Sequence, residues 1–345
     1  MKMLDMMEKY TFKDFKSDQE VRWCPGCGDY SVLASLQKVL PTVCEEKGIG
    51  KEKVVVVSGI GCSSRLPYYM NTYGFHSIHG RATAIATGIK VANPELCVWQ
   101  ASGDGDALAI GGNHFIHAIR RNVDINIMLF NNQIYGMTKG QYSPTSKLGA
   151  ITKTSPYGTV EAPFNPGSLV LGAKGTFFAR SMDTELALSQ EVMLEASRHH
   201  GTSVMEFLVN CVIFNNGSHA EISDRENKAD RILFLKKGEK MIFGKNRDKG
   251  IVLENMKLKV VTIGQDGYTE DDILVHNPSE DNLGLQTMLA EMKYPDFPVA
   301  LGVIRDVEAP NYDAEVSRQV EDVRARSRVS SMDKLLHCGS TWEVK

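Results

Sequence analysis

The sequence predicts an α/β fold in which a parallel sheet is flanked by helices and followed by a C-terminal appendage. Short apolar runs, typical of buried strands, alternate with segments of helical periodicity. Glycine-rich turns follow several of these runs, as expected where strands lead into crossover helices. After about residue 220 the chain becomes heavily charged and the alternation stops. We therefore predict an N-terminal arm at 1–22 that lies on a neighbouring chain, a main domain at 23–220, and an appendage at 221–345 that packs on the domain or on a partner.

Each element rests on its own pattern. The first helix has apolar residues on one face, the strand at 54–57 is a run of valines, and the later helices repeat at helical spacing. The GDGD segment at 103–106 is expected to form a turn. The predicted elements, in chain order, are helix 31–43, strand 54–57, helix 81–94, strand 96–101, helix 111–122, strand 125–130, strand 176–181, helix 184–200, strand 203–209, strand 258–264, helix 282–292 and helix 314–329.

Charge and composition exclude several classes of protein. The 345 residues carry a net charge of −3, which gives no bulk attraction to nucleic acid or to an anionic membrane. No apolar run is long enough to cross a bilayer, and the N-terminus lacks the regions of a signal peptide. We therefore expect a cytoplasmic protein with no nucleic-acid or membrane partner. Seven cysteines in such a chain argue against a disulfide framework and favour a metal site.

Four residues with useful chemistry directly follow predicted strands. They are Cys62, Asp104, Asn132 and Cys211. In a parallel sheet the carboxyl ends of all strands meet at one edge, where ligands bind. Residues spread over much of the chain can therefore converge on one site.

Asp104 and Asn132 have the spacing of one strand–helix–strand unit. Mg²⁺ prefers hard oxygen ligands, and these residues offer a carboxylate and an amide oxygen. The glycines at 103, 105, 111 and 112 allow backbone N–H groups to approach a phosphate. The pattern therefore predicts a magnesium-held diphosphate, and the alternative is a tight turn with an Asx turn.

Cys24 and Cys27 flank a Pro-Gly turn, so two thiolates could hold one metal ion or cluster. The alternatives are a redox dithiol, a zinc site and a turn with two buried thiols, and the CxxC spacing by itself does not choose among them. Cys62 and Cys211 would add two further thiols at the same edge. The remaining cysteines, at 44, 97 and 338, fit ordinary packing or exposure.

Basic and imidazole side chains give weaker signals. His79 could reach a diphosphate or could simply cap a helix, and Arg65 and Lys139 could hold an anionic substrate or be surface charges. His114 and His117 share one helical face and fit helix packing.

Several segments together resemble a known family. They are WCPGCGDY, SGIGCSSRLPYYMNTYGFHSIHGRA, ATGIKVANP, GDGDALAIGGNHFIHAIRRN and FNNQIYGMTKGQYSPTS. Their sequences are similar to those of the β subunit of 2-oxoacid:ferredoxin oxidoreductases, and the similarity covers about residues 20–215. The segments YYMNTYGFHSIHGRA and GQYSPTS look most like the 2-oxoglutarate branch.

The resemblance implies a thiamine-diphosphate-binding fold with Mg²⁺ and one 4Fe–4S cluster in the main domain. It implies that Cys24, Cys27, Cys62 and Cys211 ligate the cluster. It implies that Mg²⁺ is held by Asp104, Asn132 and the backbone carbonyl of Ile134. The cofactor contacts that it implies are Ile60, Gly61, Cys62, Ser63, His79, Gly80, Arg81, Ala82, Gly105, Asp106, Gly136 and Met137.

The resemblance also implies an activity and partners. The activity is coenzyme-A-dependent oxidative decarboxylation of a 2-oxoacid, with 2-oxoglutarate giving succinyl-CoA and CO₂, and with electrons passing through the cluster to ferredoxin. The activating glutamate is expected on an α subunit, since this chain offers no candidate, and the enzyme is expected to be a hetero-oligomer of two αβ units. The alternatives are a non-redox thiamine-diphosphate-dependent decarboxylase and a structural zinc protein that binds a nucleotide at GDG.

Overall fold

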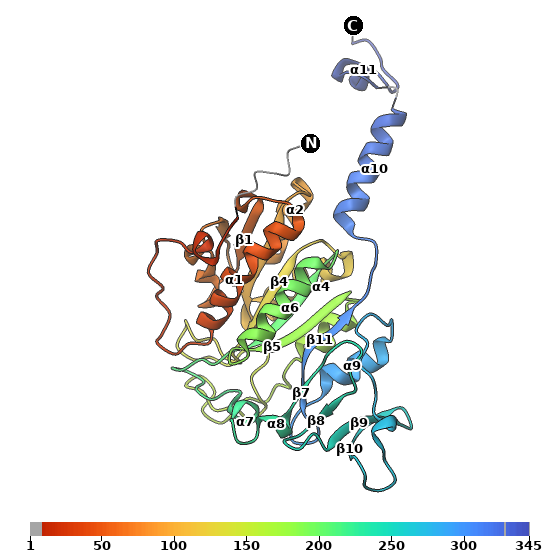
Figure 1. Cartoon of the computed structure of the whole chain (residues 1–345). Helices are drawn as coiled ribbons and strands as arrows, with labels where there is room; N and C mark the ends of the chain where they lie inside the picture. The colour runs from red at the N-terminus through yellow and green to blue at the C-terminus, as the bar shows by residue number, and fades with distance from the viewer. Residues whose placement is uncertain (1–8, 328, 345) are drawn as a thin grey trace.

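The computed structural model describes residues 9–327 and 329–344 of the chain. Within them an eight-stranded sheet has the order β2-β1-β3-β4-β6-β5-β11-β7, and a three-stranded sheet has the order β10-β9-β8 (Figure 1). The strands are β1 Val54–Ser58, β2 Tyr73–His76, β3 Cys97–Gly103, β4 Asn126–Asn131, β5 Phe177–Met182, β6 Ser203–Leu208, β7 Ile232–Phe234, β8 Ile242–Phe243, β9 Lys249–Glu254, β10 Lys257–Thr262 and β11 Val299–Asp306. The α-helices are α1 Asp29–Lys47, α2 Ala82–Ala92, α3 Asp104–Leu108, α4 Gly112–Arg121, α5 Pro166–Gly172, α6 Leu186–Arg198, α7 Ala220–Ser223, α8 Lys228–Arg231, α9 Leu283–Glu291, α10 Tyr312–Arg326 and α11 Met332–Leu336.

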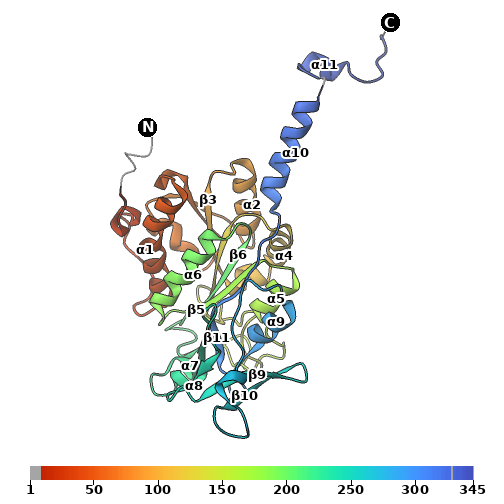
Figure 2. The same ribbon diagram turned by 45° about the vertical axis from the view of Figure 1, so that its right-hand side comes forward.

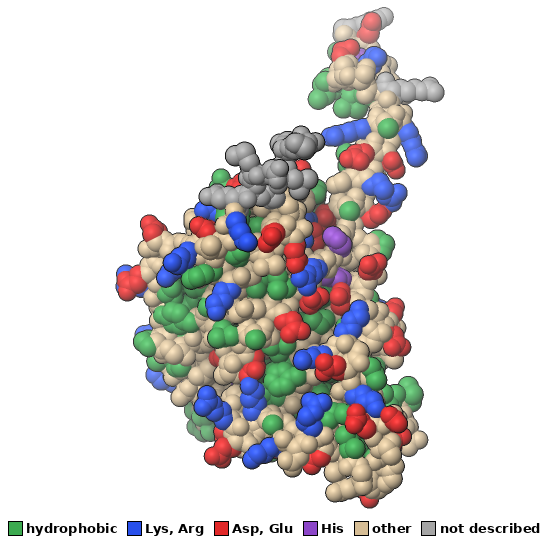
Figure 3. All heavy atoms as spheres, in the orientation of Figure 1, with side chains coloured by type: hydrophobic (Ala, Val, Ile, Leu, Met, Phe, Trp, Pro, Cys, Tyr) green, Lys and Arg blue, Asp and Glu red, His purple; other side chains and the backbone are tan. Residues whose placement is uncertain are grey.

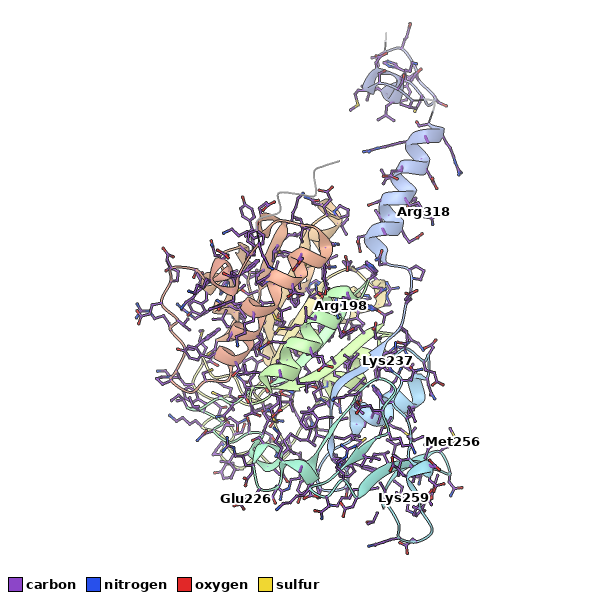
Figure 4. All side chains as sticks on the ribbon, in the orientation of Figure 1. Arg198, Glu226, Lys237, Met256, Lys259 and Arg318 are labelled. Atoms are coloured by element: carbon purple, nitrogen blue, oxygen red, sulfur yellow. The ribbon has the colours of Figure 1, made fainter. Side chains whose placement is uncertain are left out.

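The large sheet is covered by helices on both faces, which confirms the predicted α/β class. Val54 and Val56 of β1 belong to a buried cluster with α1 and α6, whereas Val55 and Val57 belong to one with α2, α4, α5 and α9. Alternate side chains of a strand point to opposite faces, so an unbroken valine run suits a strand that is buried twice. On one face, Arg198 of α6 (Figure 4) donates from Nε to Glu46 of α1 at 2.9 Å.

Most strand pairs are parallel, as the alternation of elements predicted. The pairs β1–β2, β1–β3, β3–β4, β4–β6 and β5–β6 all run the same way. Their carboxyl ends therefore meet at one edge, which we call the site edge. The predicted GDGD turn is wrong in detail, because α3 begins at Asp104 immediately after β3. Gly103 is the N-cap residue and is still extended, with φ −70° and ψ 156°, so the first helical residue is Asp104.

Two strands from the segment after residue 220 join the large sheet. β11 pairs antiparallel with β5, with Gly302 opposite Arg180, and β7 pairs parallel with β11. The β8–β10 sheet lies beside them, and Figure 4 labels Met256 at the turn between β9 and β10. A boundary at residue 220 stays a prediction, and this segment contributes to the core through Ala300 and Leu301, which are both fully buried.

The reversed direction of β11 carries the chain to the edge opposite the site edge. There the Asp313 carboxylate accepts from the backbone N–H of Asp124 at 2.9 Å, and Arg121 lies 5.8 Å from the Tyr312 ring centroid. From this root α10 projects away from the body in both ribbon views (Figures 1 and 2). We call residues 312–327 and 329–344 the C-terminal arm. It carries basic and acidic side chains along α10 and exposed hydrophobic side chains at α11 (Figure 3).

The described part of the N-terminal segment packs on its own chain. Phe15 is fully buried, and its carbonyl accepts from the backbone N–H of Asn71 at 2.9 Å. The backbone N–H of Ser17 donates to the carbonyl of Tyr69 at 3.2 Å. Residues 1–8 of the predicted arm lie outside the described residues, and the expectation that the arm lies on a neighbouring chain stays a prediction. No helix among the described residues is both long and apolar enough to cross a bilayer.

Candidate functional site

The site edge gathers the residues that the sequence placed after strands. Cys62 follows β1, Asp104 follows β3, Asn132 follows β4 and Cys211 follows β6. β4 pairs with both β3 and β6, and Gly103 pairs with Phe130, so Asp104 and Asn132 lie at adjacent strand ends. The structure therefore supplies the convergence that a parallel sheet was expected to give.

Asp104 is a buried carboxylate held by two hydroxyl groups. It is 1% exposed, and its Oδ2 accepts from Ser143 and Thr145. Burial raises the pKa of Asp104 to about 6, and the hydrogen bonds from Ser143 and Thr145 oppose that rise. Both hydroxyls come from the loop after β4, so this loop fixes the direction of the carboxylate.

The same loop forms a tight structure around Asn132. Its Oδ1 accepts from the backbone N–H of Ile134 at 3.1 Å, and its carbonyl accepts from Nδ2 of Asn215 at 2.9 Å. The Tyr135 hydroxyl donates to the Gly105 carbonyl at 2.8 Å. A Cβ at Gly105 would lie 2.3 Å from the Tyr135 ring, so only glycine fits there. The Asx turn weighed from the sequence is present, and it presents Asn132 beside Asp104.

Asp106 joins two loops that border the site. Its Oδ1 accepts from the N–H of Gly80 at 2.7 Å, and its Oδ2 accepts from the N–H of Ile60 at 3.2 Å. Burial raises the pKa of Asp106, and these backbone hydrogen bonds oppose the rise. One side chain therefore holds the Ile60–Ser63 turn and the His79–Ala82 turn together.

We expect Gly80→Ala to destabilise this arrangement. Gly80 has φ +66°, and an added Cβ would lie 2.5 Å from the backbone nitrogen of Gly111. The left-handed conformation and the clash should together lower the free energy of unfolding by about 2 kcal/mol or more. Thermal unfolding of the purified protein measures the loss.

The matched control is Gly88→Ala, within α2. An added Cβ there meets no atom within 4 Å. Since alanine is the better helix former, this variant should unfold at the same temperature or higher. Equal melting temperatures for the two variants would contradict the role given to the Gly80 turn.

The four predicted cluster cysteines lie around one part of the site edge. The Cys27 N–H donates to the Cys24 carbonyl at 3.0 Å, which closes the Pro-Gly turn. A Cβ at Gly136 would lie 3.4 Å from the Sγ of Cys211 and 3.9 Å from that of Cys62. The thiols of Cys62 and Cys211 therefore face the same glycine.

Electrostatic coupling links the two pairs of thiols. Burial raises the pKa of Cys27, and the charges of Asp29, Cys62 and Cys211 add to the rise. Burial, Asp29, Cys211 and Cys24 together raise the pKa of Cys62 to about 11. In the described part of the chain, no three His, Cys, Asp or Glu side chains lie close enough to hold a single metal ion. A 4Fe–4S cluster binds one thiolate at each iron, so it does not require three of these side chains around a single ion.

The other predicted contacts border the site edge. Arg65 donates from Nε to the Tyr69 hydroxyl at 2.9 Å and is partly exposed. Lys139 is exposed beside Gly140 and lines a cavity with Phe214. His79 is exposed and precedes α2, which begins at Ala82.

Sequence reasoning missed several residues that support the site. Ser143 and Thr145 were visible only as part of the GQYSPTS segment. Arg180 and Glu206 form a buried ion pair between β5 and β6, with Nε and Oε2 2.6 Å apart. Single charges inside the apolar strands FFARSM and SVMEFL were the available signal, because a charge is rarely buried without a partner.

Known proteins share this fold and sequence. Residues 49–207 match the family described as thiamine pyrophosphate enzyme, C-terminal TPP binding domain. The 2-oxoglutarate oxidoreductase subunit KorB of Mycobacterium tuberculosis is 46% identical over 96% of this chain and 88% of its own length. The β subunit of 2-oxoacid:ferredoxin oxidoreductase 1 from Aeropyrum pernix is 43% identical over 58% of this chain and 61% of its own length.

A solved structure is also similar across the whole chain. It is the 2-oxoglutarate:ferredoxin oxidoreductase from Magnetococcus marinus with 2-oxoglutarate, coenzyme A and succinyl-CoA bound, with a TM-score of 0.76 and 30% identity over 98% of both chains. This agreement extends over the segment after residue 220 as well as the main domain. The chain therefore belongs to the family of 2-oxoacid:ferredoxin oxidoreductase β subunits, and within it to the 2-oxoglutarate oxidoreductase group.

Proposed function

We propose that this chain is the β subunit of an enzyme that oxidises 2-oxoglutarate with coenzyme A to succinyl-CoA and CO₂ and passes the electrons to ferredoxin. The observation that carries the proposal is the meeting of a carboxylate–amide pair and four thiols at one sheet edge. The Mycobacterium tuberculosis and Magnetococcus marinus relatives support the choice of 2-oxoglutarate. The Magnetococcus structure also supports coenzyme A as the second substrate.

Thiamine diphosphate and Mg²⁺ fit the donor set at the ends of β3 and β4. Asp104, Asn132 and the carbonyl of Ile134 would hold Mg²⁺ with hard oxygen atoms. The hydroxyl groups of Ser143 and Thr145 both contact Oδ2 of Asp104 and not its Oδ1. When bound, this cofactor supplies the nucleophilic carbon and the electron sink for decarboxylation.

The loops joined by Asp106 fit the rest of the cofactor. Residues 60–63, 79–82, 105–106 and 136–137 would contact it, as the resemblance implies. The glycine in each of these four segments allows backbone N–H groups to approach a diphosphate. Arg65 and Lys139 would attract the carboxylates of the 2-oxoacid: Arg65 is partly exposed with a tyrosine hydroxyl as its hydrogen-bond partner, and Lys139 is exposed.

A 4Fe–4S cluster fits the thiols of Cys24, Cys27, Cys62 and Cys211. The turn that holds Cys24 and Cys27 lies beside the segment that holds Cys211, since the N–H of Gly28 donates to the carbonyl of Asn210 at 3.1 Å, and the thiols of Cys62 and Cys211 face Gly136. A bound cluster would accept electrons one at a time beside the cofactor.

A partner subunit completes the proposed site, and the name of β subunit that relatives carry supports this. Thiamine enzymes need a carboxylate against the aminopyrimidine ring, and we propose that it comes from an α subunit in an assembly of two αβ units. Tyr73, Phe75 and Ile78 are at least half exposed beside the site edge and would be covered by such a partner.

The test is to purify the chain alone and with its partner subunit. We expect viologen reduction by the pair in the presence of coenzyme A and 2-oxoglutarate, less with pyruvate, and none by the chain alone. Iron and labile sulfide should accompany the chain in both preparations. An iron-free pair that still decarboxylates 2-oxoglutarate would instead indicate the non-redox decarboxylase.

A further inference from the structure

A buried ion pair lies beneath the site edge and takes no part in the roles described above. Arg180 and Glu206 are directly opposite each other on β5 and β6, and they are 5% and 2% exposed. Burying two charges is costly even when they pair, so a hydrophobic pair would serve the core at least as well. The arrangement of its remaining hydrogen bonds indicates a use for this pair.

Glu206 continues the hydrogen bonding toward the site. Its second oxygen, Oε1, accepts from Nδ2 of Asn131 at 2.7 Å. A carboxylate only accepts hydrogen bonds, so Glu206 fixes the orientation of the Asn131 amide, with Nδ2 toward the ion pair and Oδ1 away from it. Asn131 is the last residue of β4 and directly precedes Asn132.

The amide oxygen of Asn131 reaches the predicted magnesium site through one more residue. It lies 2.9 Å from the hydroxyl of Thr145, which itself contacts Oδ2 of Asp104. Thr145 has a single hydroxyl proton between two acceptors, so the position of the Asn131 amide controls how Thr145 faces Asp104. The members of this chain of contacts are all at most 5% exposed: Arg180, Glu206, Asn131, Thr145 and Asp104.

The other end of the chain of contacts reaches α9. Nη2 of Arg180 donates to the carbonyl of Ala290 at 3.2 Å, and Nδ2 of Asn165 donates to the same carbonyl at 2.8 Å. Arg180 and Glu206 line a cavity whose wall also includes Ala290 and Glu291 of α9. The segment after residue 220 therefore holds the far end of the ion pair in place.

We propose that Arg180 and Glu206 are positioning residues for the magnesium–diphosphate site, acting through Asn131 and Thr145 on Asp104. This inference rests on the proposed function, because it requires Mg²⁺ at Asp104. Hydrogen-bonded groups behind a metal ligand hold it in the orientation that the metal needs, and their loss commonly weakens metal affinity by 10- to 100-fold. The ion pair is buried because the direction of Asp104 depends on it.

The test measures Mg²⁺ binding by calorimetry. The full chain, purified with its partner subunit and stripped of Mg²⁺ by chelator, is titrated with Mg²⁺ at saturating thiamine diphosphate. Glu206→Gln should weaken the Mg²⁺ affinity by roughly tenfold or more, while the iron content stays at the wild-type level. Unchanged affinity in this variant would overturn the inference.

A double-mutant cycle separates positioning from general damage to the fold. Thr145→Val should also weaken Mg²⁺ binding, and its combination with Glu206→Gln should be much less than additive, because both changes break one chain of contacts. Tyr135→Phe is the matched control: the Tyr135 hydroxyl donates to the carbonyl of Gly105, next to Asp104, and hydrogen-bonds none of the five members of the chain of contacts, so any effect on Mg²⁺ affinity should add to that of Glu206→Gln. Additive losses in the Thr145 cycle would contradict the inference.

A second variant covers the case in which Glu206→Gln does not fold. Arg180→Met with Glu206→Gln removes both buried charges together, and such replacements are often tolerated. This double variant should fold, keep its iron and bind Mg²⁺ as weakly as expected for Glu206→Gln. If the folded double variant binds Mg²⁺ as tightly as the wild type does, the positioning role is refuted. If the wild-type enzyme itself does not need Mg²⁺ to bind thiamine diphosphate, the proposed function is refuted instead.

Discussion

Cys27→Ser is expected to yield enzyme without iron and without electron transfer. Cys27 lies in the turn that brings it next to Cys24. The charges of Cys62 and Cys211 contribute to the raised pKa of its thiol. Serine keeps the size of the side chain but removes the soft ligand that iron–sulfur clusters require. Iron should fall from about four atoms per chain to below one, and viologen reduction should fall by roughly a hundredfold or more.

The remaining cysteines provide matched controls. Cys44 is buried in α1, and Cys338 is exposed in the C-terminal arm. Cys44→Ala and Cys338→Ser should keep the iron and most of the activity, whereas serine at Cys24, Cys62 or Cys211 should behave like Cys27→Ser. Normal iron in the Cys62 and Cys211 variants would show that the CxxC pair binds its metal without them.

Asp104→Asn should abolish magnesium-dependent binding of thiamine diphosphate and leave the iron in place. The amide has nearly the size of the carboxylate and can still accept from Ser143 and Thr145. It lacks the negative charge that a divalent cation requires from a site with few other charges. We expect Mg²⁺ affinity to fall by roughly a hundredfold or more and 2-oxoglutarate oxidation to fall with it.

Chelator treatment and a remote variant complete this experiment. Removing Mg²⁺ from wild-type enzyme with EDTA should reproduce the loss, and added Mg²⁺ should reverse it in the wild type only. Asp266→Asn makes the same chemical change at an exposed residue with φ +51°, a conformation that asparagine tolerates well. Tight cofactor binding by Asp104→Asn would show that the cation lies elsewhere.

The central part of the fold was predictable because its pattern is local. The valine run at 54–57 and the apolar run at 125–130 form strands that are buried on both faces, and such strands need nothing beyond apolar residues of the right length. Asp104 and Asn132 could be identified because the ends of parallel strands share one edge. Their convergence follows from topology alone.

The missed features depend on contacts between distant segments. β2 has the sequence YGFH and is exposed along its length, so only its pairing with β1 makes it a strand. β11 pairs with β5 more than a hundred residues earlier and in the opposite direction, which alternation of strands and helices does not predict. Arg180 and Glu206 each looked like an isolated charge in an apolar strand. Their partnership exists only because β5 and β6 are neighbours.

The reversed direction of β11 places the C-terminal arm far from the site edge. If β11 ran parallel to β5, it would end at the site edge, and the C-terminal arm would start beside the loops where substrates enter. Here the tail departs from the remote side, beside Arg121 and Asp124. The length and the surface residues of the C-terminal arm can therefore differ between related proteins, to suit different subunit arrangements, without changing the shape of the site.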